Sequence, residues 1–316
     1  MAYYLGIDGG GSKTTCAVGD ESSILGTATA GPSNITRVGE VRARESLHQA
    51  IQEACAAARI DPEQVQRACI GVAGAGRDEA ADTIRQIAAE IVPGEIEVVG
   101  DMQIAMAAAF GTGPGVIVIA GTGSIACGRD ALGRTARAGG WGFAISDEGS
   151  AHWIGRDAVS RVLRAIDEEN DGQSAVEASP LSRQLKAAWK IQSLGDLQRA
   201  ANSNADFAAL FPAVFAAAEA GDGLAKSVLT QAGMELARLV RTVTRRLFAP
   251  DSASLAAIPL AMAGGVFRHS PLVRKVFCNE ICQLDSRVAV SPQIVEPVTG
   301  AVQMARQGCA TPSKKK

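Results

Sequence analysis

Two stretches of this 316-residue chain repeat one pattern, a short apolar strand followed by a glycine-rich turn and a second apolar stretch. They are LGIDGGGSKTTCAV at residues 5–18 and IVIAGTGSIACG at residues 117–128. The two align without a gap, with Asp8 over Ala120, Gly9 over Gly121, Gly11 over Gly123 and Ser12 over Ser124. Glycine allows positive φ angles and close approach of a ligand, so the backbone N–H groups of each turn can converge on an anion. The pattern predicts two facing hairpins that hold a polyphosphate.

Two better-known glycine motifs do not fit these stretches. A P-loop places its lysine directly after a glycine and at the start of a helix, but here Ser12 intervenes and β-branched residues follow. The spacing G-x-G-x-x-A at residues 121–126 matches the dinucleotide motif, yet residues 127–133 indicate a turn and not a helix. Neither a Walker lysine nor a Rossmann phosphate site is expected.

Composition excludes several classes of protein. The 31 basic and 33 acidic residues nearly cancel, so no overall field attracts nucleic acid or an acidic membrane. No apolar stretch approaches the length of a membrane span, and the N-terminus lacks the pattern of a signal peptide. The seven cysteines lack C-x-x-C spacing, and Cys278 and Cys282 are expected to be core residues and not metal ligands. A reducing cytoplasm is the expected location.

Strand and helix patterns alternate through the first third of the chain, which predicts α/β layering. We expect a helix over residues 40–59, a strand over 68–73, a helix over 79–91, a strand over 96–99 and a helix over 102–110. The glycine-rich break at residues 111–115 separates an N-terminal domain, 1–113, from a C-terminal domain, 114–296. The second domain contains a helical insertion over about 165–250, and a terminal helix over about 297–310 completes the first domain.

Later segments add two further expectations. Leu229, Ala232, Leu236, Leu239, Val243 and Leu247 recur at spacings of three and four, which predicts one buried helix face. A strand over 257–263 leads into Gly264 and Gly265 and a helix near residue 270, which is a strand–turn–helix ligand position.

The combined pattern resembles the actin, sugar kinase and Hsp70 ATPase superfamily. Within it, the motifs IDGGGSKT (7–14), GDMQIA (100–105), AGTGSIACG (120–128) and GGWGFAISDEGSAHWIGRDAV (139–159) closely resemble N-acetylglucosamine kinases of the BadF/BadG/BcrA/BcrD-type ATPase family. The resemblance implies two ribonuclease H-like domains related by duplication, with a cleft between them. It also implies use of ATP and Mg²⁺, phosphorylation of the 6-hydroxyl of N-acetylglucosamine, and a homodimer.

The resemblance assigns nucleotide and metal contacts. Asp8 matches the aspartate that orients magnesium, through water, beside the phosphates; the alternative is an aspartate that caps its own turn. Lys13 would bind phosphate oxygens; the alternative is that it is a solvated surface lysine. The nucleotide contacts implied are Gly9, Gly10, Gly11, Ser12, Lys13, Thr14, Gly121, Thr122 and Gly123 for the phosphates, and Gly264, Gly265 and Val266 for the adenosine.

The resemblance also assigns the acceptor side. Asp101 matches the general base that accepts the proton of the attacking hydroxyl, although its place before a helix equally suits an N-cap. The sugar contacts implied are Asn34, Asp101, Gly123, Ser124, Gly139, Gly140, Trp141 and Asp147. Asp147 has the alternative of a helix N-cap, Asn34 of a turn residue and Trp141 of a core residue.

Three other functions stay open at this point. Ala138 replaces a cysteine that some relatives carry in the sugar pocket, which leaves glucosamine or another hexose as the acceptor. An iron–sulfur ATPase that activates a CoA-ester dehydratase or reductase would use Cys127, but no second ligand cysteine is evident. A sugar-sensing regulator would be expected to carry a helix-turn-helix before the first hairpin, and none is seen.

Overall fold

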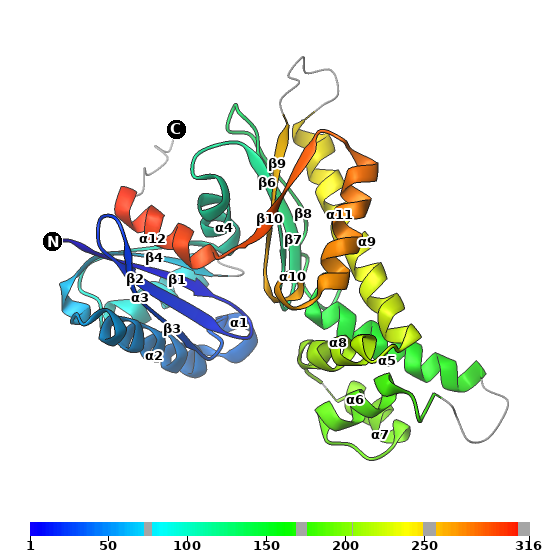
Figure 1. Cartoon of the computed structure of the whole chain (residues 1–316). Coiled ribbons are helices and arrows are strands. Elements are labelled where there is room, and N and C mark those ends of the chain that lie inside the picture. Colours follow the sequence, from blue (N-terminus) through cyan, green and yellow to red (C-terminus); the bar gives the residue numbers. More distant parts are fainter. Residues whose placement is uncertain (73–77, 169–175, 204, 249–256, 309–316) are drawn as a thin grey trace. The chain divides into compact units, whose positions relative to one another are not determined.

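The computed structural model describes residues 1–72, 78–168, 176–203, 205–248 and 257–308. The chain divides into two compact units, which we treat separately. Unit 1 is Met1–Gly113 with Val295–Lys316, and unit 2 is Pro114–Ile294. Each unit is built on a five-stranded sheet with helices packed against it, so the chain is an α/β protein (Figure 1).

Unit 1 has the strand order β3-β2-β1-β4-β5, in which β1 to β3 form an antiparallel meander and β1, β4 and β5 run parallel. Its strands are β1 Tyr3–Gly9, β2 Thr14–Gly19, β3 Ile24–Ala30, β4 Val65–Val72 and β5 Glu95–Gly100. Its helices are α1 Ile35–Val38, α2 Glu40–Ala58, α3 Asp78–Ala89, α4 Asp101–Phe110 and α12 Pro297–Gln307, with a 3₁₀ turn at Pro62–Gln64.

Two separate apolar layers hold this sheet. On one face, Leu47 of α2 and Ile87 of α3 pack against strand residues such as Ile7 in a fully buried cluster. On the other face, Ile104 of α4 and Ala301 of α12 pack against the sheet. Successive side chains of a strand point to opposite faces, so each buried strand residue serves one layer or the other. The last described helix therefore covers the second face of the sheet, where it also contacts the first strand.

Unit 2 repeats the layout of unit 1. Its order β8-β7-β6-β9-β10 has the hairpin strand β6 at the centre, as β1 is in unit 1, and β9 runs parallel to it. Its strands are β6 Gly115–Ala120, β7 Ser124–Arg129, β8 Thr135–Gly139, β9 Ile258–Ala263 and β10 Val288–Val295. Its helices are α5 Ala151–Glu168, α6 Pro180–Trp189, α7 Leu194–Ala201, α8 Phe211–Glu219, α9 Gly223–Leu247, α10 Gly265–His269 and α11 Pro271–Leu284, with a 3₁₀ turn at Phe207–Leu210.

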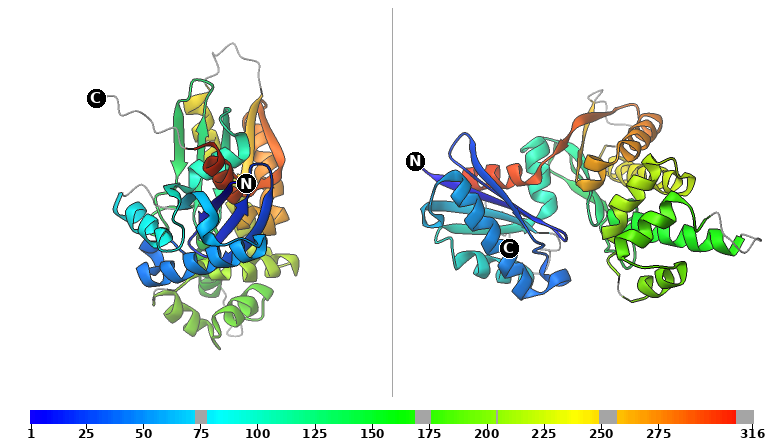
Figure 2. Two further views of the ribbon diagram at one scale, coloured as in Figure 1. Left: turned by 90° about the vertical axis from the view of Figure 1, so that its left-hand side faces the viewer. Right: turned by 60° about the horizontal axis from the view of Figure 1, so that its bottom comes forward.

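Helix α9 is the centre of the apolar core of unit 2. It lies along the sheet beside α11, and α5 to α8 extend from it (Figure 2). Its predicted apolar face is buried except at Leu239, which is half-buried. Val118 and Met262 bring the sheet into the same cluster. The 3.6-residue period thus located the main core helix of this unit.

The strands that follow each hairpin were missed or shortened by the sequence analysis. The predicted turn at 127–133 is not a helix, as expected, but β7 continues to Arg129 and only residues 130–133 turn. Asp130 closes that turn by accepting the N–H groups of Leu132 and Arg134, each at 2.9 Å. Residue 73 of the predicted strand 68–73, and residues 169–175, 204 and 249–250 of the predicted insertion, lie outside the described residues.

Among the described residues, no single helix has the length and apolar character to cross a membrane. Phe207–Glu219 and Gly223–Leu247 reach that threshold only as a pair, and they are bent by 118°.

Candidate functional site

The two glycine hairpins close in slightly different ways. In unit 1, Gly9 pairs with Thr14, and the turn of residues 10–13 is closed by Gly10 N donating to Lys13 O at 2.9 Å. In unit 2, Ala120 pairs with Ser124, and the turn of residues 121–123 is closed by Gly121 N donating to Gly123 O at 2.9 Å. The second turn is shorter, so the gapless alignment of Ser12 with Ser124 is wrong.

The residues that correspond are Thr14 and Ser124, each the first residue of its second strand. Thr14 Oγ1 donates to Gly31 O at 2.7 Å and lies 2.7 Å from Ser33 Oγ, while Ser124 Oγ donates to Glu148 O at 2.8 Å. Both side chains are buried. The expected phosphate contact of the Thr14 hydroxyl and sugar contact of the Ser124 hydroxyl therefore do not fit, because these groups anchor each hairpin to a later segment.

Most other residues of the two turns are at least partly exposed. Ser12 and Lys13 are exposed, and Gly10, Gly11, Gly121, Thr122 and Gly123 are partly exposed. Gly9 is buried, and a side chain there would meet Ser33 Oγ at 2.8 Å, so it serves close packing. The ligand-facing part of the first hairpin is therefore its tip.

Two carboxylates lie at one edge of the sheet of unit 1. In the register of β1, β4 and β5, Gly9 pairs with Val72 and Val72 with Gly100, so Asp8 and Asp101 lie beside the carboxyl ends of these parallel strands. Burial, followed by the charge of Asp101, raises the pKa of Asp8 to about 7. Burial also raises the pKa of Asp101. Two acids held in this way favour a proton or a cation between them.

The immediate surroundings of Asp8 identify one residue that sequence reasoning missed. Lys13 lowers the pKa of Asp8 by its charge, and Glu296, at the start of α12, raises it. Within the described part of the chain, the Asp8 carboxylate accepts no hydrogen bond, so the turn-cap alternative has no support. Glu296 carries no motif; only its place directly before the proline of α12 could have drawn attention to it.

Asp101 is the first residue of α4 and not its cap. Gln103 takes the capping role, since its side-chain oxygen accepts the N–H of Gly100 at 2.9 Å. One oxygen of Asp101 accepts the N–H of Met102 at 2.9 Å. This bond fixes the carboxylate at the helix start, where the helix dipole favours negative charge.

The Gly264 turn of unit 2 lies against the end of β6. Gly264 has φ +100°, and an added Cβ would lie 2.3 Å from Ala120 O, so only glycine fits there. Gly265 begins α10, and the Val266 side chain is buried, so Val266 can offer a ligand only its backbone. The turn and the second hairpin thus meet at the same edge of the sheet.

A glycine-rich loop between β8 and α5 carries the predicted sugar contacts of unit 2. Gly139, Gly140, Gly142 and Gly149 have positive φ, and so does Asp147, at 68°. Asp147 is not the cap of α5, because Ser150 Oγ accepts the N–H of Trp153 at 3.1 Å. Burial raises the pKa of Asp147, while the N–H groups of Ser124 and Gly142 lower it by hydrogen bonding.

Two other predicted sugar contacts are displayed to solvent. Trp141 is 66% exposed, and the guanidinium of Arg137 lies 4.4 Å from its ring centre, so the core alternative for Trp141 is wrong. Asn34 precedes α1 and is partly exposed, and its side chain makes no capping hydrogen bond. Both side chains are available to a ligand.

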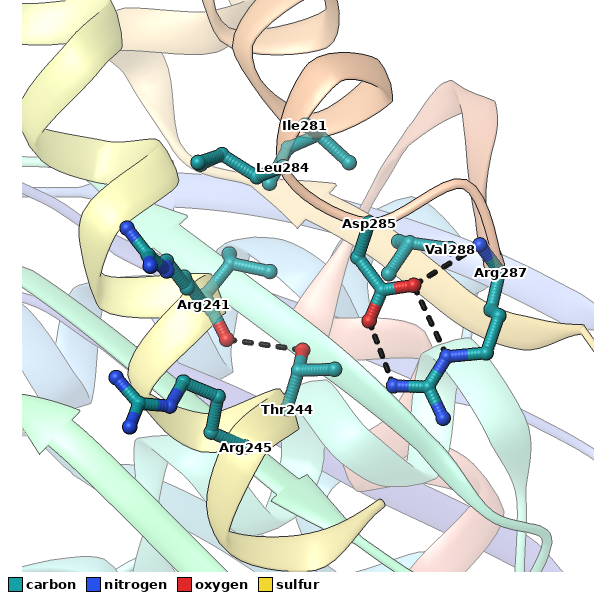
Figure 3. Close-up of a pocket in the computed structure, with 9 residues that line it drawn as sticks. Arg241, Thr244, Arg245, Ile281, Leu284, Asp285, Arg287 and Val288 are labelled. Atoms are coloured by element: carbon teal, nitrogen blue, oxygen red, sulfur yellow. Dashed lines mark hydrogen bonds and ion pairs between the residues drawn. The ribbon is translucent and has the colours of Figure 1, made fainter. Parts of the chain in front are cut away.

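A hollow of about 400 Å³ on unit 2 contains none of the predicted site residues. It lies between α9, α11 and β10, and Figure 3 shows Asp285 and Arg287 facing each other inside it, with N···O distances of 2.8 and 3.0 Å. The Asp285–Arg287 pair satisfies the charges of both groups. We assign the hollow no function.

An iron–sulfur ATPase would need side chains that bind its cluster. In the part of the chain that the structure describes, no group of three or more His, Cys, Asp or Glu side chains is arranged to hold a metal ion. Cys127 is buried in β7. A cluster shared between two copies would need an accessible thiol, so this alternative gains no support from the structure.

Comparison with known proteins agrees with this architecture. The family model for the BadF/BadG/BcrA/BcrD ATPase family matches residues 5–305. An N-acetylmuramic acid/N-acetylglucosamine kinase from Clostridium acetobutylicum is 32% identical, with 98% of this chain and 100% of the relative covered. An N-acetyl-D-glucosamine kinase from Dictyostelium discoideum is 26% identical, with 96% and 97% covered.

The fold is shared with the solved structure of a protein from Chromobacterium violaceum. Its TM-score is 0.74 at 24% identity, with 96% of this chain and 99% of that chain covered. The family model spans nearly the whole chain, and the first relative is matched over its full length. The chain therefore belongs to the BadF/BadG/BcrA/BcrD ATPase family.

Proposed function

We propose that this protein is a sugar kinase that transfers the γ-phosphoryl group of ATP to the 6-hydroxyl of N-acetylglucosamine. The observation that carries the proposal is the pair Asp8 and Asp101, held together at the carboxyl edge of one sheet with raised pKa values. The names of the relatives support the class of reaction and an amino sugar as acceptor.

In this proposal Asp101 is the general base. As the 6-oxygen of the sugar attacks the γ-phosphorus, its proton passes to the Asp101 carboxylate, the bond from phosphorus to the bridging oxygen breaks, and ADP leaves. The raised pKa of Asp101 makes it a stronger base than an exposed aspartate. The hydrogen bond from Met102 N holds the carboxylate in place at the start of α4.

The Asp8 site fits a hydrated magnesium ion. Its carboxylate is partly buried, lies near two other acids and accepts no hydrogen bond within the described residues, so a cation there would offset an unfavourable charge. Magnesium, when bound, neutralises charge on the phosphates. Backbone N–H groups at residues 11–13 and 122–123 bind phosphate oxygens, because those of Gly10 and Gly121 close their own turns, and the Gly264 turn accepts the adenosine.

The sugar contacts in the proposal are Asn34, Asp101, Gly123, Gly139, Gly140, Trp141 and Asp147. The exposed ring of Trp141 suits the apolar face of a sugar or an acetyl methyl. Asn34 and Asp147 bind hydroxyls, and a buried polar group left without its partner disfavours sugars of the wrong pattern by about 1–3 kcal/mol. We also propose that the protein is a homodimer in the cytoplasm. Light scattering tests the oligomeric state, and cell fractionation tests the location.

The decisive experiment measures ADP release with ATP and Mg²⁺ against N-acetylglucosamine, N-acetylmuramic acid, glucosamine, glucose and N-acetylmannosamine. We expect the highest kcat/KM with N-acetylglucosamine and no turnover after EDTA. A higher kcat/KM with glucosamine or glucose would mean that this sugar, and not N-acetylglucosamine, is the acceptor; the proposed reaction would stay the same. ATP consumption independent of every sugar would refute the kinase.

Asp101→Asn tests the base. General-base catalysis contributes about 10²–10⁴ in rate, so we expect kcat to fall by that factor while the sugar still binds, as measured by calorimetry. The matched control is Gln103→Ala, which removes the helix cap but keeps the carboxylate. An Asp101→Asn enzyme with wild-type kcat would exclude this role.

A further inference from the structure

The second phosphate hairpin is tied to the glycine-rich loop and α5 by a continuous set of hydrogen bonds. Gly140 N donates to Ser124 O at 3.0 Å, and Ser124 Oγ donates to Glu148 O at 2.8 Å. The first two residues of α5 donate their N–H groups to the carbonyls of Gly121 and Thr122 at 2.9 and 3.3 Å. The loop that carries the sugar contacts and the turn that carries the phosphate contacts therefore form one bonded structure.

Asp147 lies at the centre of this structure. The residue is only 6% exposed, and its carboxylate accepts the N–H of Ser124 from the hairpin and the N–H of Gly142 from the loop. A Cβ on Gly123 would lie 2.8 Å from Asp147 Oδ2, so the carboxylate lies directly against the turn. The backbone of Asp147 has φ +68°, a conformation of higher energy for a residue with a side chain.

We propose that Asp147 is a positioning residue for the phosphate hairpin in addition to its sugar contact. This inference rests on the proposed function, because it presumes that the hairpin binds nucleotide. A carboxylate has about four acceptor positions, so two N–H groups leave room for sugar hydroxyls. One carboxylate then serves the hairpin, the loop and the sugar.

The negative charge and both oxygens of Asp147 are needed for this role. Hydrogen bonds from backbone N–H groups to a carboxylate are charge-assisted and stronger than those to a neutral acceptor. An asparagine keeps one acceptor oxygen and places an NH₂ group where the second N–H points, so one of the two bonds is lost. Whichever bond is lost, Asp147 no longer links the hairpin to the loop.

The test measures binding of a non-hydrolysable ATP analogue, with Mg²⁺ and without any sugar, by calorimetry. For Asp147→Asn we expect Kd to rise about tenfold, as expected for loss of one charge-assisted hydrogen bond. A residue that only contacts sugar would leave this Kd unchanged and raise only the KM for sugar. An unchanged Kd in a folded Asp147→Asn protein would therefore overturn the inference.

The matched control is Asn34→Ala, which removes a proposed sugar contact in unit 1. We expect its KM for sugar to rise while its Kd for the analogue without sugar stays at the wild-type value. An equal weakening of analogue binding in both variants would overturn the inference, because the effect would not be particular to Asp147.

A second variant guards against misfolding. Ser124→Ala removes only the bond to Glu148 O, and we expect a Kd about threefold higher, with the melting temperature showing that the protein is folded. Wild-type analogue affinity in Ser124→Ala, if Asp147→Asn does not fold, would overturn the inference. Failure of the wild type to phosphorylate any sugar would refute the proposed function but leave the comparison of analogue affinities valid.

Discussion

Asp8 shows most directly how burying a charged group at this site lowers the stability of the fold. Its pKa is about 7 in the folded chain, raised first by burial and then by the charge of Asp101, against an ordinary value of 3.8. Between these two pH values the folded state binds more protons than the unfolded state. The free energy of unfolding therefore falls as pH rises from about 4 to 7, and the contribution is constant above that range.

Asp8→Asn should remove this pH-dependent loss of stability. Without nucleotide or Mg²⁺, we expect the melting temperature of the variant to exceed that of the wild type by a few degrees at pH 8, and the difference to shrink toward pH 5. Glu63→Gln, which alters an exposed carboxylate, is the control and should show no such trend. Calorimetric scans from pH 5 to 8 check this. If the difference in melting temperature grew toward low pH, Asp8 would not destabilise the fold at high pH as we predict.

The same residue scale shows what the sequence could and could not reveal. Asp8 is the second-to-last residue of β1 and Asp101 directly follows β5, and the apolar runs before these acids predicted their positions near strand ends. The alignment of Ser12 with Ser124 failed because hairpin length is set by which residues pair across the strands, and pairing is not visible in a linear alignment. Glu296 was missed because its proximity to Asp8 depends on the return of the chain to unit 1.

At the scale of elements, periodicity located the long helices well and the edge strands poorly. Helix α9 and the strand–turn–helix at Gly264 were predicted because their apolar residues follow a clear period. Strands β3, β8 and β10 were missed because they lie at or near sheet edges, and their half-exposed side chains give a weak apolar signal. The sequence therefore predicted the centre of each sheet better than its margins.

The contact between the Gly264 turn and β6 can be tested with two alanine substitutions. Gly264 and Gly133 both have positive φ, but an added Cβ would lie 2.3 Å from Ala120 O at Gly264 and would meet nothing within 4 Å at Gly133. We expect Gly133→Ala to cost about 1–2 kcal/mol from backbone strain alone. Gly264→Ala should cost more, about 3–5 kcal/mol, because the β6 backbone must also move. Equal losses in the free energy of unfolding, measured with denaturant, would mean that the Gly264 turn does not pack against β6 as described.

At the scale of the whole molecule, the last described helix returns to the unit that the first strand begins. Helix α12 packs on α4 and on the face of the sheet opposite α2 and α3. Arg306 also donates to Asp20 O and Ser23 O, each at 2.7 Å, which ties α12 to the turn between β2 and β3. Unit 1 cannot complete its core until α12 has been synthesised, whereas unit 2 is continuous in sequence.

The packing of α12 on α4 is very close at Gly300, so this position is sensitive to any added side chain. An added Cβ there would lie 2.0 Å from Ile104 O and 2.5 Å from Ala108 N, because α12 and α4 touch through their backbones. In an exposed helix position, Gly→Ala stabilises by about 1 kcal/mol, so a large opposite effect identifies packing as the cause. Gly223→Ala at the start of α9, where nothing lies within 4 Å, is the matched control.

We expect Gly300→Ala to destabilise by about 3–5 kcal/mol and Gly223→Ala to be neutral or slightly stabilising. Limited proteolysis followed by mass spectrometry locates the damage, since unit 2 keeps its own core. Cleavage of Gly300→Ala should begin within residues 1–113, while fragments from residues 114–294 persist. First cleavage within unit 2, or unfolding of Gly300→Ala at the wild-type denaturant concentration, would mean that α12 does not complete unit 1 in solution.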